Sequence, residues 1–205
     1  YFILENVRRI LTIDNKKTIN TIMETISEIG YEMSWFLMNS ADYGIPQNRR
    51  RVFFIGSKKK LKKKHPLEPP PVKKLLQTTL DILEKKVSEK YHLSEKILKT
   101  ILCEGTSGYK SKVTINSKVA KCLTKTMHKM HRANQDNYFS NQYINDDLNK
   151  KWIRRITPIE AFRLQGFPDS FVINAMKAGV SDTQLYMQAG NSVTVDVVYA
   201  LLKTL

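Results

Sequence analysis

The chain opens on Tyr1-Phe2-Ile3-Leu4-Glu5-Asn6-Val7, in which apolar residues run directly into a carboxylate and an amide. This pattern predicts a buried strand that delivers an acidic side chain at its C-terminal end, where open α/β sheets bind their ligands. A buried parallel strand needs a neighbour on both sides, and no residue precedes Tyr1 to supply one of them. We therefore expect the numbering to begin inside a domain, with some partners of Glu5 outside the chain.

The next residues alternate between helical and extended patterns. Residues 18–29 carry isoleucine and methionine at the spacing of one helix face, and Gly30 suits the position just after a helix. Residues 31–38 and 51–55 are apolar and predict strands separated by a polar turn. The order strand, helix, strand, loop, strand predicts an α/β fold.

The rest of the chain has weaker periodicity. Residues 104–147 are polar and irregular, and they predict short strands and loops. Thr157, Pro158 and Glu160 are typical of a helix start, with Thr157 as the N-cap. Apolar spacing predicts further helices in residues 73–86, 94–102, 181–187 and 193–202.

The formal net charge of +15 is concentrated in the middle of the chain. Residues 58–150 carry 21 lysines and arginines against 9 acidic residues, whereas residues 1–57 and 151–205 are nearly neutral. A lysine run over residues 58–64 and several prolines after it mark the boundary. We expect a folded core in residues 1–57, a polyanion-binding insert in 58–150 and a return to the core in 151–205. A solvated lysine-rich surface would give the same charge pattern, so charge alone leaves both interpretations open.

The composition argues against several classes of protein. No apolar run reaches the about 18 residues of a membrane span, and the first residues lack the regions of a signal peptide. Cys103 and Cys122 are too few and wrongly spaced for a structural zinc site, and they favour a reducing, cytoplasmic setting. His128 and His131 lack further ligands nearby, so we expect no metal.

Two short motifs offer donors to a ligand. Gln47, Arg49 and Arg51 alternate, so a strand would place both guanidiniums on one face and Arg50 on the other. Such a pair forms a fork for carbonyl and phosphate oxygens. The sequence Gly190-Asn191-Ser192-Val193 precedes an apolar helix, whose first amide groups would suit a carboxylate or hydroxyl. Taken singly, the first motif is also typical of a solvated basic patch and the second of an ordinary N-cap.

Four motifs follow one another in a fixed order. They are Glu5-Asn6-Val7, then Gln47-x-Arg49-x-Arg51, then the segment Thr157–Pro168, and last Gly190-Asn191-Ser192-Val193. With a basic insert between the second and the third, they resemble the C-terminal part of the DNA cytosine-5 methyltransferases. The resemblance runs from end to end and is weak between residues 60 and 145. It implies part of a Rossmann-like, S-adenosylmethionine-dependent methyltransferase sheet in 1–57 and 151–205, interrupted by a mostly irregular target-recognition region in 58–150.

The resemblance also implies roles for single residues. The substrate is double-stranded DNA, from which the target cytosine is flipped out. Glu5 binds N3 and the exocyclic amine of the ring and delivers a proton, while Arg51 donates to O2 and Arg49 supports the catalytic loop or the DNA backbone. The implied S-adenosylmethionine contacts are Asn191, Ser192 and Val193. The expected DNA contacts are Gln47, Lys125, Lys129, Arg132, Arg154 and Arg155.

The sequence departs from the family pattern in what it lacks. The nucleophilic cysteine of a Pro-Cys element is absent, and so is the glycine-rich segment that holds most of the cofactor. We expect an N-terminal portion or subunit to supply both, and no activity from this chain alone. Cys122-Leu123 also stands where the family often has Thr-Leu. The alternative is a non-enzymatic DNA-binding remnant or subunit. The resemblance further implies a bacterial-type, cytoplasmic restriction-modification setting.

Overall fold

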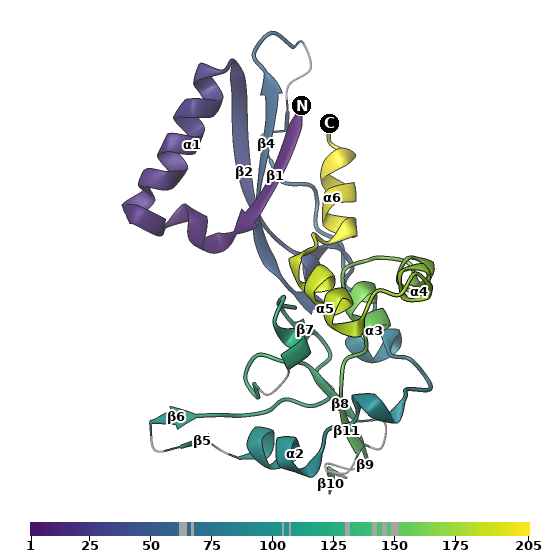
Figure 1. Ribbon diagram of the computed structural model, residues 1–205. Coiled ribbons are helices and arrows are strands. Elements are labelled where there is room, and N and C mark those ends of the chain that lie inside the picture. Colours follow the sequence, from purple (N-terminus) through teal and green to yellow (C-terminus); the bar gives the residue numbers. More distant parts are fainter. Residues whose placement is uncertain are drawn as a thin grey trace.

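The computed structural model describes most of the 205 residues of the chain. The described residues are 1–61, 65–66, 68–103, 105–106, 108–129, 132–140, 143–144, 147–148 and 152–205. Figure 1 shows a sheet flanked by helices α1 (Lys17–Glu28) and α6 (Val195–Leu202), and a second region of short strands around α2 (Glu95–Leu102). Within the described ranges, no helix is long and apolar enough to cross a membrane.

The main sheet has three strands in the order β1 (Phe2–Val7), β4 (Arg50–Lys58), β2 (Tyr31–Asn39). Strand β4 is antiparallel to both neighbours, so β1 and β2 run in the same direction. The strands expected from the sequence are therefore present. The neighbour that β1 has in the described chain, β4, is antiparallel to it and not parallel as expected. The other edge of β1 has no partner among the described residues, and Leu4 is 49% exposed.

One helix covers each face of this sheet (Figure 1). Alternate residues of a strand face opposite sides, so β2 and β4 can be apolar toward both helices. One face packs against α6 through a cluster that contains Phe36, Met38, Phe53, Ile55, Val197 and Leu201. The other face packs against α1 through Ile19, Val52 and Phe54. Since α6 lies near the C-terminus, the last segment of the chain returns to the sheet that the first segment builds.

The ends of α1 follow from local conformation. Its three preceding residues, Asp14, Asn15 and Lys16, all have left-handed backbone angles, and Thr18 Oγ1 donates to Asp14 Oδ2 at 3.0 Å. Gly30 ends the helix with a φ of +87°, a conformation that glycine adopts without a Cβ penalty. The helix predicted for residues 18–29 is thus confirmed to within one residue at each end.

The basic middle of the chain consists mainly of short elements, as expected. They are β3 (Gln47–Asn48) just before it, and within it η4 (Thr79–Ile82), η5 (Glu89–Tyr91), α2, β5 (Gly105–Thr106), β6 (Tyr109–Lys110), β7 (Ala120–Lys121), η6 (Met127–Lys129), β8 (Tyr138–Ser140), β9 (Tyr143–Ile144) and β10 (Asp147–Leu148). Strand β8 pairs with β11 (Ile153–Arg155), and the predicted helix over residues 94–102 forms as α2.

The helix predicted for residues 73–86 does not form, apart from the single turn η4. The backbone amides of this segment bond to distant carbonyls instead of to their own helix. Lys73 N donates to Asp42 O at 2.8 Å, and Thr79 N donates to Lys118 O at 2.8 Å. Tertiary hydrogen bonds therefore override the helical spacing of its leucines.

Four helices complete the chain: α3 (Pro158–Arg163), α4 (Asp169–Lys177), α5 (Asp182–Asn191) and α6. The predicted capping box is present, because Glu160 N donates to Thr157 Oγ1 and Thr157 N donates to Glu160 Oε2. The position expected for Gly190 and Asn191 is wrong. They end α5 instead of opening the last helix, which begins at Val195 after a separate N-cap, Thr194. This part of the motif presents carbonyl groups where amides were expected.

Candidate active site at the ends of strands β1 and β4

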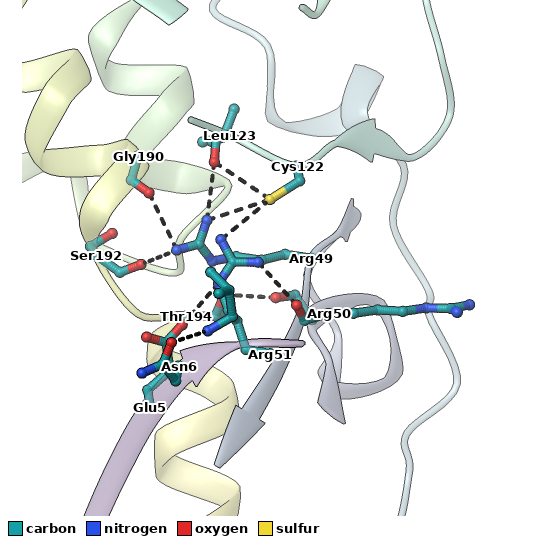
Figure 2. Close-up of polar contacts among 12 residues, drawn as sticks. Glu5, Asn6, Arg49, Arg50, Arg51, Cys122, Leu123, Gly190, Ser192 and Thr194 are labelled. Carbon is teal, nitrogen blue, oxygen red and sulfur yellow. Dashed lines mark hydrogen bonds and ion pairs between the residues drawn. The ribbon is translucent and has the colours of Figure 1, made fainter. Parts of the chain in front are cut away.

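Glu5 and Arg51 form an ion pair at the centre of the candidate site (Figure 2). Arg51 lies opposite Val7 in the β1–β4 register, so Glu5 is its diagonal neighbour on the same face. Glu5 Oε1 and Arg51 Nε are 2.9 Å apart, and the side chains are 23% and 18% exposed. This Oε1 atom is buried and is engaged by the Arg51 guanidinium, although the contact does not have hydrogen-bond geometry. The carboxylate as a whole is partly exposed, so a ligand can approach it beside the guanidinium.

Arg49 is buried beside this pair and binds three peptide carbonyls. Its Nη1 donates to Leu123 O at 3.1 Å, and its Nη2 donates to Gly190 O at 3.3 Å and to Ser192 O at 2.7 Å. Burial lowers the pKa of Arg49, and the neighbouring charge of Arg51 lowers it further. The guanidinium thus joins the residue between β3 and β4 to the basic insert and to the end of α5, where a cation offsets the helix dipole.

Arg50 extends away from Arg49 and Arg51 (Figure 2), which is the alternation that strand geometry predicts.

Cys122, which belongs to the basic insert, lies close to Arg49 and Arg51. Its Sγ lies 3.6 Å from Arg49 Nη1 and 3.7 Å from Arg51 Nη2. No local pattern predicts that Cys122 lies here, because it is more than 70 positions away from both arginines in the chain.

The DNA contact expected of Gln47 is not compatible with its position. Its side chain is fully buried, donates to Leu164 O at 2.5 Å and accepts from Leu123 N at 3.0 Å. Strand β3 brings it there by pairing in parallel with β7, which aligns Gln47 with Ala120. Gln47 therefore holds the basic insert against the segment after α3 and does not face solvent.

Arg154 is also buried, which corrects the DNA contact expected for it. Arg154 and Glu160 are both 0% exposed, and two Arg154 nitrogens donate to the two Glu160 oxygens at 2.8 Å each. Glu160 also accepts from the backbone amides of Thr157 and Glu84, both at 2.9 Å. Such a bidentate pair ties β11 to α3, and the burial of Arg154 keeps its guanidinium out of reach of a DNA phosphate.

The other four basic residues expected to contact DNA retain some exposure. Lys125 and Lys129 are exposed, and Arg132 pairs with Asp136 at 2.8 Å while its own side chain stays 37% exposed. Arg155 is partly buried, with its guanidinium 5.6 Å from the ring centre of Tyr91. These four stay predictions for DNA contacts.

Gly190 is where the basic insert packs most closely on α5. A Cβ atom at this position would overlap the backbone of Thr124 and Lys125. The next residue, Asn191, is exposed at the end of α5, and Ser192 Oγ donates to Ala189 O at 2.9 Å. Because Asn191 is exposed, its side-chain amide can bind a carboxylate or hydroxyl, and the residues present fit a peripheral part of a cofactor site.

A buried polar network lies beneath the site and was not foreseen from the sequence. Gln165 Nε2 donates to Ala189 O at 2.7 Å, and Thr194 Oγ1 lies 3.1 Å from Gln165 Oε1 and 2.7 Å from Ser40 Oγ. These bonds connect the segment after α3, the two last helices and the end of β2. In the described part of the chain, no group of three or more side chains could hold a metal ion, and His131 lies outside that part.

Comparisons with known proteins agree on one family. The family model described as "C-5 cytosine-specific DNA methylase" matches residues 1–205. The type II methyltransferase M1.ScrFI of Lactococcus lactis subsp. cremoris is 34% identical over 211 residues, which cover 98% of this chain and 50% of that protein. M.SsoII of Shigella sonnei is 34% identical over 98% of this chain and 51% of its own length. The chain thus spans about half the length of these relatives.

Solved structures show the same fold at lower identity. The Dnmt2 methyltransferase of S. pombe superposes with a TM-score of 0.74 at 17% identity, over 98% of this chain and 65% of that structure. The methyltransferase EhMeth of Entamoeba histolytica gives a TM-score of 0.72 at 22% identity, over 98% and 60%. At these identities the likeness supports the α/β fold and nothing finer.

Proposed function

The chain belongs to the C-5 cytosine-specific DNA methylases, and we propose that it is the C-terminal portion of an enzyme that methylates C5 of a cytosine in a specific sequence of duplex DNA. The observation that carries this proposal is the partly exposed Glu5–Arg51 ion pair, which places a carboxylate beside a guanidinium. Type II methyltransferases among the relatives favour a restriction-modification setting in a bacterial cytoplasm.

Glu5 and Arg51 offer complementary groups to the edge of a flipped cytosine. The carboxylate of Glu5 can accept from the exocyclic amine, and a proton on the carboxyl can reach N3. The guanidinium of Arg51, held by Glu5 and near Cys122, can donate to O2. When a nucleophile attacks C6, negative charge develops on the ring, and both groups stabilise it. Interactions that strengthen in the transition state raise the rate.

In this proposal Arg49 is a positioning residue. Its bonds to Leu123, Gly190 and Ser192 fix the basic insert relative to the Glu5–Arg51 pair. The insert is the target-recognition region, with DNA contacts from Lys125, Lys129, Arg132 and Arg155. Recognition of the sequence and placement of the flipped base would then be coupled through a single buried guanidinium.

The cofactor S-adenosylmethionine supplies the methyl group when it is bound. Asn191, Ser192 and Val193 would contribute a minor edge of its pocket, and Asn191 offers the exposed amide. An N-terminal portion or subunit would provide the rest of the pocket and the cysteine nucleophile. It would also extend the sheet into a Rossmann-like one along the free edge of β1, where Leu4 is half exposed.

The test combines this chain with an N-terminal methyltransferase segment that carries the Pro-Cys and glycine-rich motifs. Methyl transfer to DNA is measured with radiolabelled S-adenosylmethionine. Glu5→Gln should lower kcat by about 100-fold or more, since a positioned proton donor contributes on that scale. The matched control is Glu24→Gln, which removes an exposed carboxylate from α1 and should leave kcat unchanged. Equal activity of the two variants would contradict the proposal.

The strongly basic insert favours a second candidate, a DNA-binding module without catalysis. It predicts salt-dependent DNA binding by this chain alone, because binding to phosphates releases counterions. It also predicts no methyl transfer with any N-terminal segment. Methyl transfer in the combined preparation would exclude it.

A further inference from the structure

Contacts from three segments of the chain hold the guanidinium of Arg51 (Figure 2). Arg51 Nε lies 2.9 Å from Glu5 Oε1 on β1, and Arg51 Nη1 donates to Arg50 O on β4 at 3.0 Å. Arg51 Nη2 lies 3.7 Å from the sulfur of Cys122 in the basic insert. Each guanidinium nitrogen therefore has one contact among the described residues, and Cys122 supplies the contact that comes from the insert.

The backbone on both sides of Cys122 is bonded to the core, so the sulfur has a fixed position. Lys121, before it, belongs to β7, which pairs with β3. After it, Leu123 N donates to Gln47 Oε1 at 3.0 Å, and Leu123 O accepts from Arg49 Nη1 at 3.1 Å. Leu123 and Gln47 are both buried. A side chain anchored in this way can fix the direction of a neighbouring group.

The Arg51 head group needs such a contact because it lies beside a second cation. Arg49 and Arg51 carry like charges, and repulsion alone would turn their head groups apart. The sulfur of Cys122 lies beside both, at 3.6 Å from Arg49 Nη1 and 3.7 Å from Arg51 Nη2. The Glu5 contact at Nε fixes the position of the Arg51 head group, and the contacts at the two Nη atoms fix its plane.

A thiol at this position leaves Arg51 able to bind a ligand. Sulfur is a weak acceptor, and each Nη atom carries two N–H groups. One N–H of Arg51 Nη2 can therefore face Cys122 while the other donates to a substrate oxygen. A carboxylate in place of the thiol would bind the guanidinium more strongly and compete with that oxygen.

We infer that Cys122 is a positioning residue for Arg51, through which the basic insert directs the guanidinium toward O2 of the target cytosine. This inference rests on the proposed function, which assigns O2 to Arg51, and it adds a residue of the insert to the catalytic arrangement. Arg49 anchors the insert, whereas Cys122 acts on the arginine that touches the base. A displacement of the insert would therefore displace the Arg51 head group directly.

The first test measures methyl transfer by this chain combined with the N-terminal segment. Cys122→Ala should lower kcat roughly tenfold, on the scale of one contact to a charged group. KM for DNA should stay unchanged, because an interaction made in the transition state appears in kcat. Cys122→Ser restores an acceptor and should recover most of kcat. Cys103→Ala is the matched control, since it changes an exposed cysteine at the end of α2 and should leave kcat unchanged.

Cys122→Val separates the loss of the sulfur from the loss of packing. Its methyl groups fill the space of the sulfur without offering an acceptor, so kcat should fall as it does in Cys122→Ala. This variant keeps the test valid if Cys122→Ala leaves a cavity and fails to fold. Normal kcat in Cys122→Val would overturn the inference.

A double-variant cycle tests whether the sulfur acts through Arg51. In an Arg51→Ala background, Cys122→Ala should lower kcat no further, because two residues that act as a unit are not additive. An equal loss of kcat in both backgrounds would assign the effect to Arg49 or to packing, and it would overturn the inference.

NMR of the guanidinium N–H groups tests the contact in this chain alone. The Arg51 signals are assigned by their absence from Arg51→Lys. Cys122→Ala should shift or broaden them, because the head group loses one of its three contacts, and Cys103→Ala should not. Unchanged signals overturn the inference whatever the kinetics show.

The two proposals fail separately. Methyl transfer that is unaffected by Cys122→Ala refutes the positioning role alone. Arg51 signals that respond to Cys122→Ala, without any methyl transfer by the unsubstituted chain, refute the proposed function and support the positioning of Arg51.

Discussion

Replacing Glu160 by glutamine should destabilise the chain severely, because the substitution leaves a buried positive charge without a partner. Glu160 and Arg154 are both fully buried, and the carboxylate accepts four hydrogen bonds, two from Arg154 and two from backbone amides. A glutamine keeps one acceptor oxygen and turns an NH₂ group toward donors. Removing one partner of such a pair costs about 3–5 kcal/mol in the free energy of unfolding. For a chain of this length, Tm should fall by about 6–20 °C.

The assay is urea unfolding followed by circular dichroism and tryptophan fluorescence. Asp169→Asn is the control, since it removes a carboxylate that pairs with Arg163 at 2.6 Å but is 42% exposed. That change should cost about 1 kcal/mol or less. The double variant Arg154→Met with Glu160→Leu should cost less than Glu160→Gln alone, because no unpaired charge remains. A loss below about 1 kcal/mol for Glu160→Gln would refute the reasoning and reopen a surface role for Arg154.

Three further outcomes follow from the same packing. Gly190→Ala should cost about 1–3 kcal/mol in unfolding free energy, because its Cβ would overlap the Thr124 backbone. Gly108→Ala, at a position where a Cβ meets open space, tests whether glycine loss alone does this. Tyr186→Phe should cost about 1–3 kcal/mol by leaving Ile156 O without its 2.5 Å bond, and an unchanged urea midpoint would contradict this. Burial raises the pKa of Tyr91 to about 12. Its contribution to stability should be complete below pH 10 and lost as pH rises toward 12. Tyrosine absorbance at 295 nm should report that transition, and full stability at pH 12 would exclude it.

Sequence reasoning succeeded where the signal is local. The alternation of Arg49, Arg50 and Arg51 predicted which side chains share a face, and Figure 2 shows Arg50 pointing away from the other two. The capping box at Thr157 and the stop at Gly30 also formed as expected. Each of these depends on residues within one or two turns, so neighbouring backbone geometry suffices to set them.

The same reasoning failed where a distant segment supplies the partner. A glutamine or arginine in a basic, DNA-binding family is a reasonable candidate for a phosphate contact. Gln47 instead bonds to residues 76 and 117 positions away, and Arg154 is enclosed with Glu160. The helix expected for residues 73–86 does not form for the same reason, because backbone amides of this segment donate to carbonyl groups of distant segments.

Sequence patterns alone predict the family, the order of the main elements and the acidic residue at the end of the first strand. The ordered motifs indicate the family and the acidic residue. The spacing of apolar residues indicates the elements, because side chains return to the same face every 2 residues in a strand and every 3.6 residues in a helix. The folded chain is needed to show that Glu5 pairs with Arg51, that Arg49 binds three carbonyls and that Cys122 lies beside both arginines. Those contacts depend on strand register and on how the insert packs against α5, and no local pattern encodes either of them.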